Sequence, residues 1–433
     1  MSTCPAGRVG NARRDTRSET GRFSPNKAAT VGRAERCPKR LPPVFGATSG
    51  RGFLLLVTGV AVAASLLCGT PAAAAERIVL RNLQIIRDRP VETFDEDGVR
   101  LQGGMVIPWD EIERGTVAPQ KQAAFDQMLK DLGESLYRIR RRLTVGDYVE
   151  LAAPAEAVYP RYVGRNSKTA YMVWQATMWS RLAAGRREAA LEPYLYCYEY
   201  SRRLGGRPVA LPGNRRLKFD PATGMTPELL PVWFDRDAVK AAMPGVLKAA
   251  QQMRHPMPKG VRVYYATLAF AAGDPVRATE VLAAVDDRQG PLAELRDIAK
   301  AQGEVLAGRP GQSVRRLVLT LDQLAPANKP LALYWLGIAR LQSGQERVRQ
   351  EGILQLLHLP ALYGKSHPAL AAAGLYRAML ALEKQDNPAG SRALRGELLA
   401  RYGQTYHADK ARKQQDSPER NSAHESKPPE PKR

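Results

Sequence analysis

The side chains best suited to catalysis or metal binding are thinly spread in this sequence. No two of its histidines have the i, i+4 spacing that places two imidazoles on one helix face around zinc. They are His255, His358, His367, His407 and His424. His358 and His367 flank one short segment and could meet in space, but two separate surface or loop histidines are the simpler expectation. The sequence therefore predicts no metal ion.

Adjacent acidic residues do not predict a catalytic dyad either. Asp110 is followed by Glu111, and Asp286 by Asp287. Neighbouring residues on a helix or strand point in different directions, so we expect solvated surface carboxylates at both places. The phosphate-binding pattern G-x-x-x-x-G-K-[ST] and the nucleophile pattern G-x-S-x-G are both absent. We predict no catalytic residue, no cofactor and no enzymatic activity.

The most aromatic stretch of the chain combines two glutamates with four tyrosines. These residues are Glu192, Tyr194, Tyr196, Tyr198, Glu199 and Tyr200. The stretch could present a surface to a carbohydrate or a peptide. Packing of a helix explains it more simply, although Pro193 would kink that helix. Cys197 at its centre is then a small core residue.

The chain is basic, and its charge is unevenly placed. The 433 residues carry a formal net charge of +22. Residues 1–52 account for +8 of this and residues 53–75 for none, which leaves +14 on the remainder. That charge favours anionic surfaces. It is spread along the chain without a recognisable DNA- or RNA-binding module, so nucleic acid is not an expected partner.

An export segment is predicted near the N-terminus. Residues 1–52 form a basic extension that we expect to be disordered. Residues 53–75 are uncharged, largely apolar and end in four alanines, which predicts a signal peptide cleaved after Ala75. An uncleaved membrane anchor is the alternative. Cys4, Cys37 and Cys68 precede that cleavage point, so a processed chain keeps Cys197 alone and forms no internal disulfide. We expect an exported protein of the periplasm or cell envelope.

Residues 76–117 predict a small β module. Short β-type runs lie at 77–80, 84–86, 99–101 and 105–107, which suggests about four strands. Gln102, Gly103 and Gly104 join the last two runs as a hairpin connection. A module of this size is not stable alone, so we expect it to dock on the helices that follow.

A helical-repeat domain is predicted from residue 118 to 407. Its first helix shows an apolar stripe at helical spacing, formed by Phe125, Leu129, Leu132, Leu136, Ile139 and Leu143. Basic residues at the end of that helix suit the helix dipole.

Turn glycines then recur at nearly constant spacing. Each ends an apolar helical stretch, and they are Gly185, Gly273, Gly308 and Gly344. The last two intervals are 35 and 36 residues. Small residues follow the first three glycines by five positions, and large ones follow by nine. These are Ala190, Ala278 and Ser313, then Tyr194, Leu282 and Leu317. A turn glycine, a small crossing residue and a large core residue are typical of a helical hairpin.

This pattern resembles the tetratricopeptide repeat family over about residues 165–407. In the first helix of each hairpin, that family has two neighbouring positions at which helices pack closely. Leu336 with Gly337 and Tyr265 with Ala266 match these positions, and Trp174 matches an aromatic position of the same helix. Pro291 and Pro326 lie one residue from the expected closing proline. Arg181, Ala269, Glu304 and Arg340 stand where that family usually has an aromatic residue, and Arg349 replaces a small one.

The resemblance implies a mainly α fold, an α-solenoid of helical hairpins whose first helices line a concave groove. Seven residues are then expected to face that groove: Gln175, Trp179, Thr267, Phe270, Gln302, Tyr334 and Gln342. Glutamate at Gln302 and Gln342 is expected to weaken partner capture without lowering helicity. Core packing of Trp179 and Phe270 is the competing interpretation.

Three hypotheses of function follow from these features. The first is an exported scaffold that holds a protein or peptide partner of the cell envelope. The second is adhesion to an anionic envelope polymer through the basic surface. The third is a hydrolase or lyase on an α-helical toroid, with acidic groups converging from separate helices.

Three segments are expected to depart from the repeat. Residues 205–235 are rich in glycine and proline and predict an irregular loop. Residues 345–370 predict a lengthened unit with an insertion at Leu359–Gly364. Residues 408–433 contain no apolar residue beyond alanine and predict a disordered charged tail.

Overall fold

The structure is a computed structural model that describes residues 76–415, apart from 88, 208 and 210. The predicted extension 1–52, the export segment 53–75 with its cleavage after Ala75, and the tail from residue 416 onward lie outside the described residues. Within the described residues, no helix is both long enough and apolar enough to cross a membrane. The described chain is mostly helical and begins with a small antiparallel sheet module.

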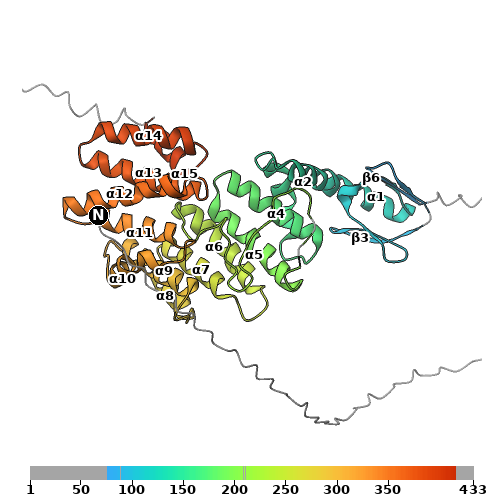
Figure 1. Cartoon of the computed structure of the whole chain (residues 1–433). Coiled ribbons are helices and arrows are strands. Elements are labelled where there is room, and N and C mark those ends of the chain that lie inside the picture. The colour runs from blue at the N-terminus through green and yellow to red at the C-terminus, as the bar shows by residue number, and fades with distance from the viewer. Residues whose placement is uncertain (1–75, 88, 208, 210, 416–433) are drawn as a thin grey trace, which may run out of the picture. The chain divides into compact units, whose positions relative to one another are not determined.

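The β module consists of two three-stranded antiparallel sheets (Figure 1). The first has the order β2-β1-β6 and comprises β1 (Arg77–Leu80), β2 (Ile85–Ile86) and β6 (Ile112–Thr116). The second has the order β3-β4-β5 and comprises β3 (Val91–Asp95), β4 (Gly98–Leu101) and β5 (Val106–Ile107). A 3-10 turn, η1 (Trp109–Glu111), precedes β6.

The predicted hairpin of this module is present, and two strands were missed. Gly103 and Gly104 adopt positive φ angles of 88° and 81°, and the Gly104 amide donates to the Leu101 carbonyl. This left-handed backbone is the conformation that favours glycine. Strands β3 and β6 were not predicted because charged residues interrupt the apolar residues in both.

A single long helix follows, as the apolar stripe predicts. It comprises α1 (Pro119–Met128), a π-helical turn η2 (Leu129–Gly133) and α2 (Glu134–Val145). The stripe residues are buried, with Leu129 partly buried. Phe125 packs against Trp109, with ring centroids 5.3 Å apart, and so joins this helix to the β module.

The rest of the described chain is a succession of helices, each packed on the next one or two (Figure 1). They are α3 (Ala152–Tyr162), α4 (Lys168–Ala183), α5 (Arg187–Arg203), α6 (Arg236–Gln251), α7 (Lys259–Ala272), α8 (Pro275–Ala283), α9 (Pro291–Leu306), α10 (Gln312–Thr320) with η3 (Leu321–Gln323), α11 (Lys329–Leu341), α12 (Glu346–Tyr363), α13 (Pro368–Lys384), α14 (Pro388–Tyr402) and α15 (Tyr406–Gln415). Helices α7, α9, α11 and α13 also contact one another in sequence.

All four predicted turn glycines lie between helices, and three of them have a positive φ angle. Gly185, Gly273 and Gly308 follow α4, α7 and α9 with φ angles of 71°, 92° and 67°. Gly344 lies between α11 and α12 without a positive φ. The tyrosine-rich stretch forms most of α5, where Tyr194, Tyr196, Tyr198 and Cys197 are buried, as the packing interpretation predicts.

Two departures from the repeat pattern have structural roles. Glu304 accepts hydrogen bonds from the backbone amides of Gly311, Ser313 and Val314, and so caps the start of α10. Arg181 donates to both carboxylate oxygens of Glu156, at 2.9 and 2.8 Å. A polar group that ties two helices together thus stands where the family pattern has an aromatic ring.

Residues 204–235 contain no helix or strand among those described, so the predicted loop is confirmed. Three other expectations are wrong. The segment Leu359–Gly364 is not an insertion, because α12 continues to Tyr363 and buries Leu359. Residues 408–415 are not a disordered tail, because α15 buries Ala408 and Ala411. Asp110 is buried rather than solvated, since its carboxylate pairs with Arg140.

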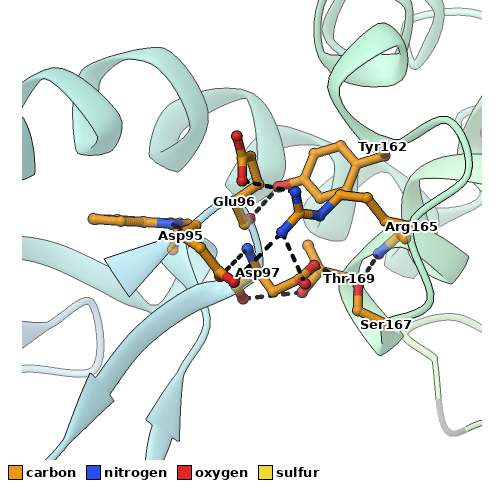
Figure 2. Close-up of polar contacts among 9 residues, drawn as sticks. Asp95, Glu96, Asp97, Tyr162, Arg165, Ser167 and Thr169 are labelled. Atoms are coloured by element: carbon orange, nitrogen blue, oxygen red, sulfur yellow. Dashed lines mark hydrogen bonds and ion pairs between the residues drawn. The ribbon is translucent and has the colours of Figure 1, made fainter. Parts of the chain in front are cut away.

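The β module is attached to the helices by an acidic turn. Figure 2 shows the Arg165 guanidinium facing Asp95, the last residue of β3, and Glu96 and Asp97, which join β3 to β4. Its distances to the three carboxylates are 3.4, 2.8 and 3.4 Å. Ser167 donates to the Asp97 carboxylate as well. The turn between α3 and α4 thus binds these three carboxylates through one guanidinium and one hydroxyl, and the contact joins the β module to the helices.

Candidate partner-binding groove

Two adjoining cavities run beside the C-terminal halves of α7, α9, α11 and α13. Their volumes are about 480 and 510 Å³, and they share Ile338, Gln342 and Arg377 in their walls. We call the two cavities together the groove. It is lined by Trp233, Phe234, Arg236, Phe270, Ala271, Gly273, Val305, Leu306, Tyr334, Trp335, Ile338, Leu341, Gln342, Glu346, Arg349, Arg377, Leu380, Ala381, Lys384, Gln385 and His407.

Apolar side chains from successive helices form much of the groove wall. Phe270 comes from α7, Leu306 from α9, Ile338 from α11 and Leu380 from α13. Leu306 is 50% exposed and so offers apolar area to the groove. Solvent-accessible apolar residues in a concave surface are typical of a binding site.

Trp335 gives this wall an unused hydrogen-bond donor. Its side chain is only 4% exposed, yet its indole Nε1 has no hydrogen-bond partner within the described part of the chain. A buried N–H without a partner costs free energy, and tryptophan at binding surfaces usually satisfies it with a ligand acceptor. A carbonyl or carboxylate oxygen is the group that would satisfy it.

The basic residues of the groove divide into two kinds. Arg236 donates to the carbonyl of Ala272, and Arg349 donates to the carbonyls of Ser343 and Gly344. Arg236 therefore caps the end of α7, where a cation suits the dipole, and Arg349 holds the turn between α11 and α12. Arg377 lies in the middle of α13, is exposed and pairs with no carboxylate in the residues that the structure describes.

His407 adds no charge to the groove. It is 4% exposed and packs between the rings of Phe234, Tyr376 and Tyr406. Burial, helped by the nearby positive charge of Arg377, lowers its pKa to about 3. The imidazole is therefore neutral near pH 7, and its Nδ1 is buried without a hydrogen-bond partner among the described residues.

The structure separates the seven residues that the resemblance places in a groove. Phe270, Tyr334 and Gln342 line it. The other four are buried in helix contacts and do not line it: Gln175, Trp179, Thr267 and Gln302.

Two of the glutamines make the same kind of bond between successive first helices. Gln302 Nε2 donates to the Thr267 carbonyl at 3.0 Å, and Gln342 Nε2 donates to the Val305 carbonyl at 2.9 Å. The two bonds lie at different points of their units, because Gln302 is six residues before Gly308 and Gln342 is two before Gly344. Gln342 is also exposed to the groove, whereas Gln302 is 1% exposed.

The residues that define the groove most clearly were missed by the sequence argument. They are Trp335, Ile338, Arg377 and Leu380. One indication was available: Arg377 is the only charged residue in the run from Leu375 to Leu382.

Because Gln302 is buried and Gln342 is exposed, glutamate at these two positions is expected to reduce stability by different amounts. Gln302→Glu is expected to lower the free energy of unfolding by about 3 kcal/mol or more, because it buries a carboxylate beside the Thr267 carbonyl oxygen. Gln342→Glu is expected to lower the free energy of unfolding by about 1 kcal/mol, the net contribution of one hydrogen bond. Urea unfolding of both variants measures the difference. Equal losses would show that Gln302 is not buried as described.

The described residues contain no group of three or more His, Cys, Asp or Glu side chains placed to hold a metal ion. Comparisons of the chain with protein-family models, curated protein sequences and solved structures gave no match.

Proposed function

We propose that this protein is a non-enzymatic binding protein whose groove holds an extended segment of a partner protein. The segment carries apolar side chains together with acidic ones. The observation that carries the proposal is the conjunction of an open apolar wall, the partnerless Trp335 Nε1 and the unpaired Arg377 within one groove.

The chemistry of the partner follows from these three features. Leu306, Ile338 and Leu380 offer contact area to apolar side chains. Trp335 suits a backbone carbonyl or a carboxylate, and Arg377 suits a carboxylate. Aromatic residues and arginine are also the side chains that contribute most of the binding energy at protein interfaces.

The repeated contacts support a tetratricopeptide-like solenoid. Turn glycines with positive φ recur after α4, α7 and α9, and α7, α9, α11 and α13 contact one another in sequence. Export to the periplasm or envelope is part of the same proposal, supported by the apolar segment 53–75, and it makes an envelope protein the expected partner.

The rival hypotheses differ from this one in measurable ways. Adhesion to an anionic polymer depends on diffuse charge and weakens steeply with salt. A helical-toroid hydrolase needs several carboxylates around one pocket, whereas the groove wall contains Glu346 as its one carboxylate.

Selection from a random displayed peptide library tests the proposal. We expect enriched peptides to combine Asp or Glu with Leu or Phe, and to keep at least about a tenth of their affinity at 0.5 M NaCl because apolar contacts are not screened. Enrichment of purely acidic peptides that dissociate at that salt concentration would favour polymer adhesion instead. No enrichment would count against a peptide groove.

A further inference from the structure

Another cavity, of about 240 Å³, adjoins the groove and shares Phe234 and His407 with it. The first residues of three helices line it: Arg187 of α5, Pro368 of α13 and Tyr406 of α15. The turn after α4 closes one side, and a Cβ on Gly185 would lie 3.3 Å from the Gln404 carbonyl oxygen. Helix N-termini carry partial positive charge, so three of them favour an anion in this cavity.

Two arginines, Arg187 and Arg215, and one carboxylate, Glu228, line this cavity, and Glu228 forms its ion pair with Arg215 rather than with Arg187. Arg187 Nη2 donates to the Leu230 carbonyl at 3.0 Å, and its Nε is buried without a hydrogen-bond partner in the described chain. It makes no ion pair with any described carboxylate. The neighbouring Glu188 carboxylate instead accepts from the backbone amide of Phe234 at 3.0 Å. A guanidinium stays charged when buried, so this arrangement costs free energy until an anion binds.

The other polar groups of the cavity complete a binding surface. Arg215 stacks over the Trp179 ring at 3.6 Å and pairs with Glu228 at 3.0 Å, which fixes the position of its guanidinium. His407 lines the cavity with a buried Nδ1 that has no partner among the described residues. Apolar side chains, among them Leu230 and Val232, cover the remaining wall.

We propose that this cavity binds a small organic oxyanion, a carboxylate or a phosphate ester, whose charged group pairs with Arg187. The volume is below the usual range for drug-sized ligands, so the body of the ligand is limited to a few heavy atoms. The apolar wall accommodates that body. Phe234 and His407 line both this cavity and the groove, but the anion site depends on Arg187, which does not line the groove, so either proposal can be wrong without the other.

Calorimetric titration of the full chain with inorganic phosphate and with acetate tests the site. We expect at least one probe to bind at one site per chain with a Kd of about 1 mM or tighter. Arg187→Gln is expected to weaken that binding at least about tenfold, the value of a lost charge-assisted hydrogen bond. Phosphate binding alone would indicate a phosphate ester, and acetate binding alone a carboxylic acid.

Arg186→Gln is the matched control, because Arg186 is adjacent, exposed and paired with Glu156 outside the cavity. It should bind the probe as the unmodified chain does. Arg187→Lys keeps the positive charge but loses the planar guanidinium, so it should bind the probe several-fold more weakly than the unmodified chain. This variant tests the role of Arg187 if Arg187→Gln does not fold. The proposal is overturned if neither probe binds at about 10 mM, or if the Arg186 and Arg187 variants lose binding equally.

Discussion

Replacing Arg140 with leucine is expected to lower the free energy of unfolding by about 3–5 kcal/mol. The partner of Arg140 is Asp110, whose side chain has no solvent exposure. Asp110 Oδ2 accepts from Arg140 Nε, while Oδ1 has no hydrogen-bond partner among the described residues. Without Arg140 the carboxylate would remain buried and uncompensated, at the junction of η1 and α2.

Urea unfolding with two further variants separates this effect from a general loss of charge. Arg141→Leu removes the neighbouring exposed arginine and should change stability by about 0.5 kcal/mol or less. The double variant Asp110→Leu with Arg140→Leu removes both charges and should recover most of the loss, because a buried pair is often replaceable by apolar residues. A loss in Arg140→Leu no larger than that in Arg141→Leu would contradict the buried pair.

Reversing the charge of Arg377 is expected to weaken the binding of a selected acidic–apolar peptide about 30- to 700-fold. This corresponds to about 2–4 kcal/mol, the cost of losing a charge pair and gaining repulsion at a partly desolvated contact. Arg377 has no carboxylate partner among the described residues, so Arg377→Glu should leave the fold intact. Fluorescence anisotropy with a labelled peptide measures the affinity.

Arg315→Glu is the control for net charge. Arg315 is exposed on α10 and does not line the groove. It should change the affinity about twofold or less at physiological salt, because exposed charges at a distance are screened. Equal weakening by both reversals would show that the basic chain attracts the peptide non-specifically.

Periodicity predicted the parts of the fold that depend on one element at a time. The stripe from Phe125 to Leu143 shows one buried face, because burial along a single helix repeats every 3.6 residues. Gly185, Gly273 and Gly308 were identifiable because a turn that needs a positive φ favours glycine. The hairpin at Gly103 and Gly104 follows from the same preference.

Features that depend on contacts between distant elements were not predictable in this way. Asp110 was expected in solvent because nothing near it in sequence shows that Arg140 neutralises it. The tail was expected to be disordered because Ala408 and Ala411 are small and weakly apolar, although α15 buries both.

The groove shows the same limit. Gln302 and Gln342 each donate to a backbone carbonyl of an earlier helix, and yet one is covered by its neighbours and the other is exposed. A repeat pattern specifies which residues correspond, whereas exposure depends on what each unit packs against. The pattern therefore indicated the helices of the groove and three of its residues, but not Trp335 or Arg377.

Site-specific photo-crosslinking tests the central claim, partner binding in the groove, most directly. The photoreactive residue p-benzoyl-phenylalanine would be placed at Ile338, inside the groove, and separately at Val318, which is 45% exposed on α10. With a selected acidic–apolar peptide, we predict strong crosslinking from position 338, little from position 318, and loss of the first on adding Arg377→Glu. Crosslinking of equal strength from both positions, or none from position 338, would contradict the groove as the binding site.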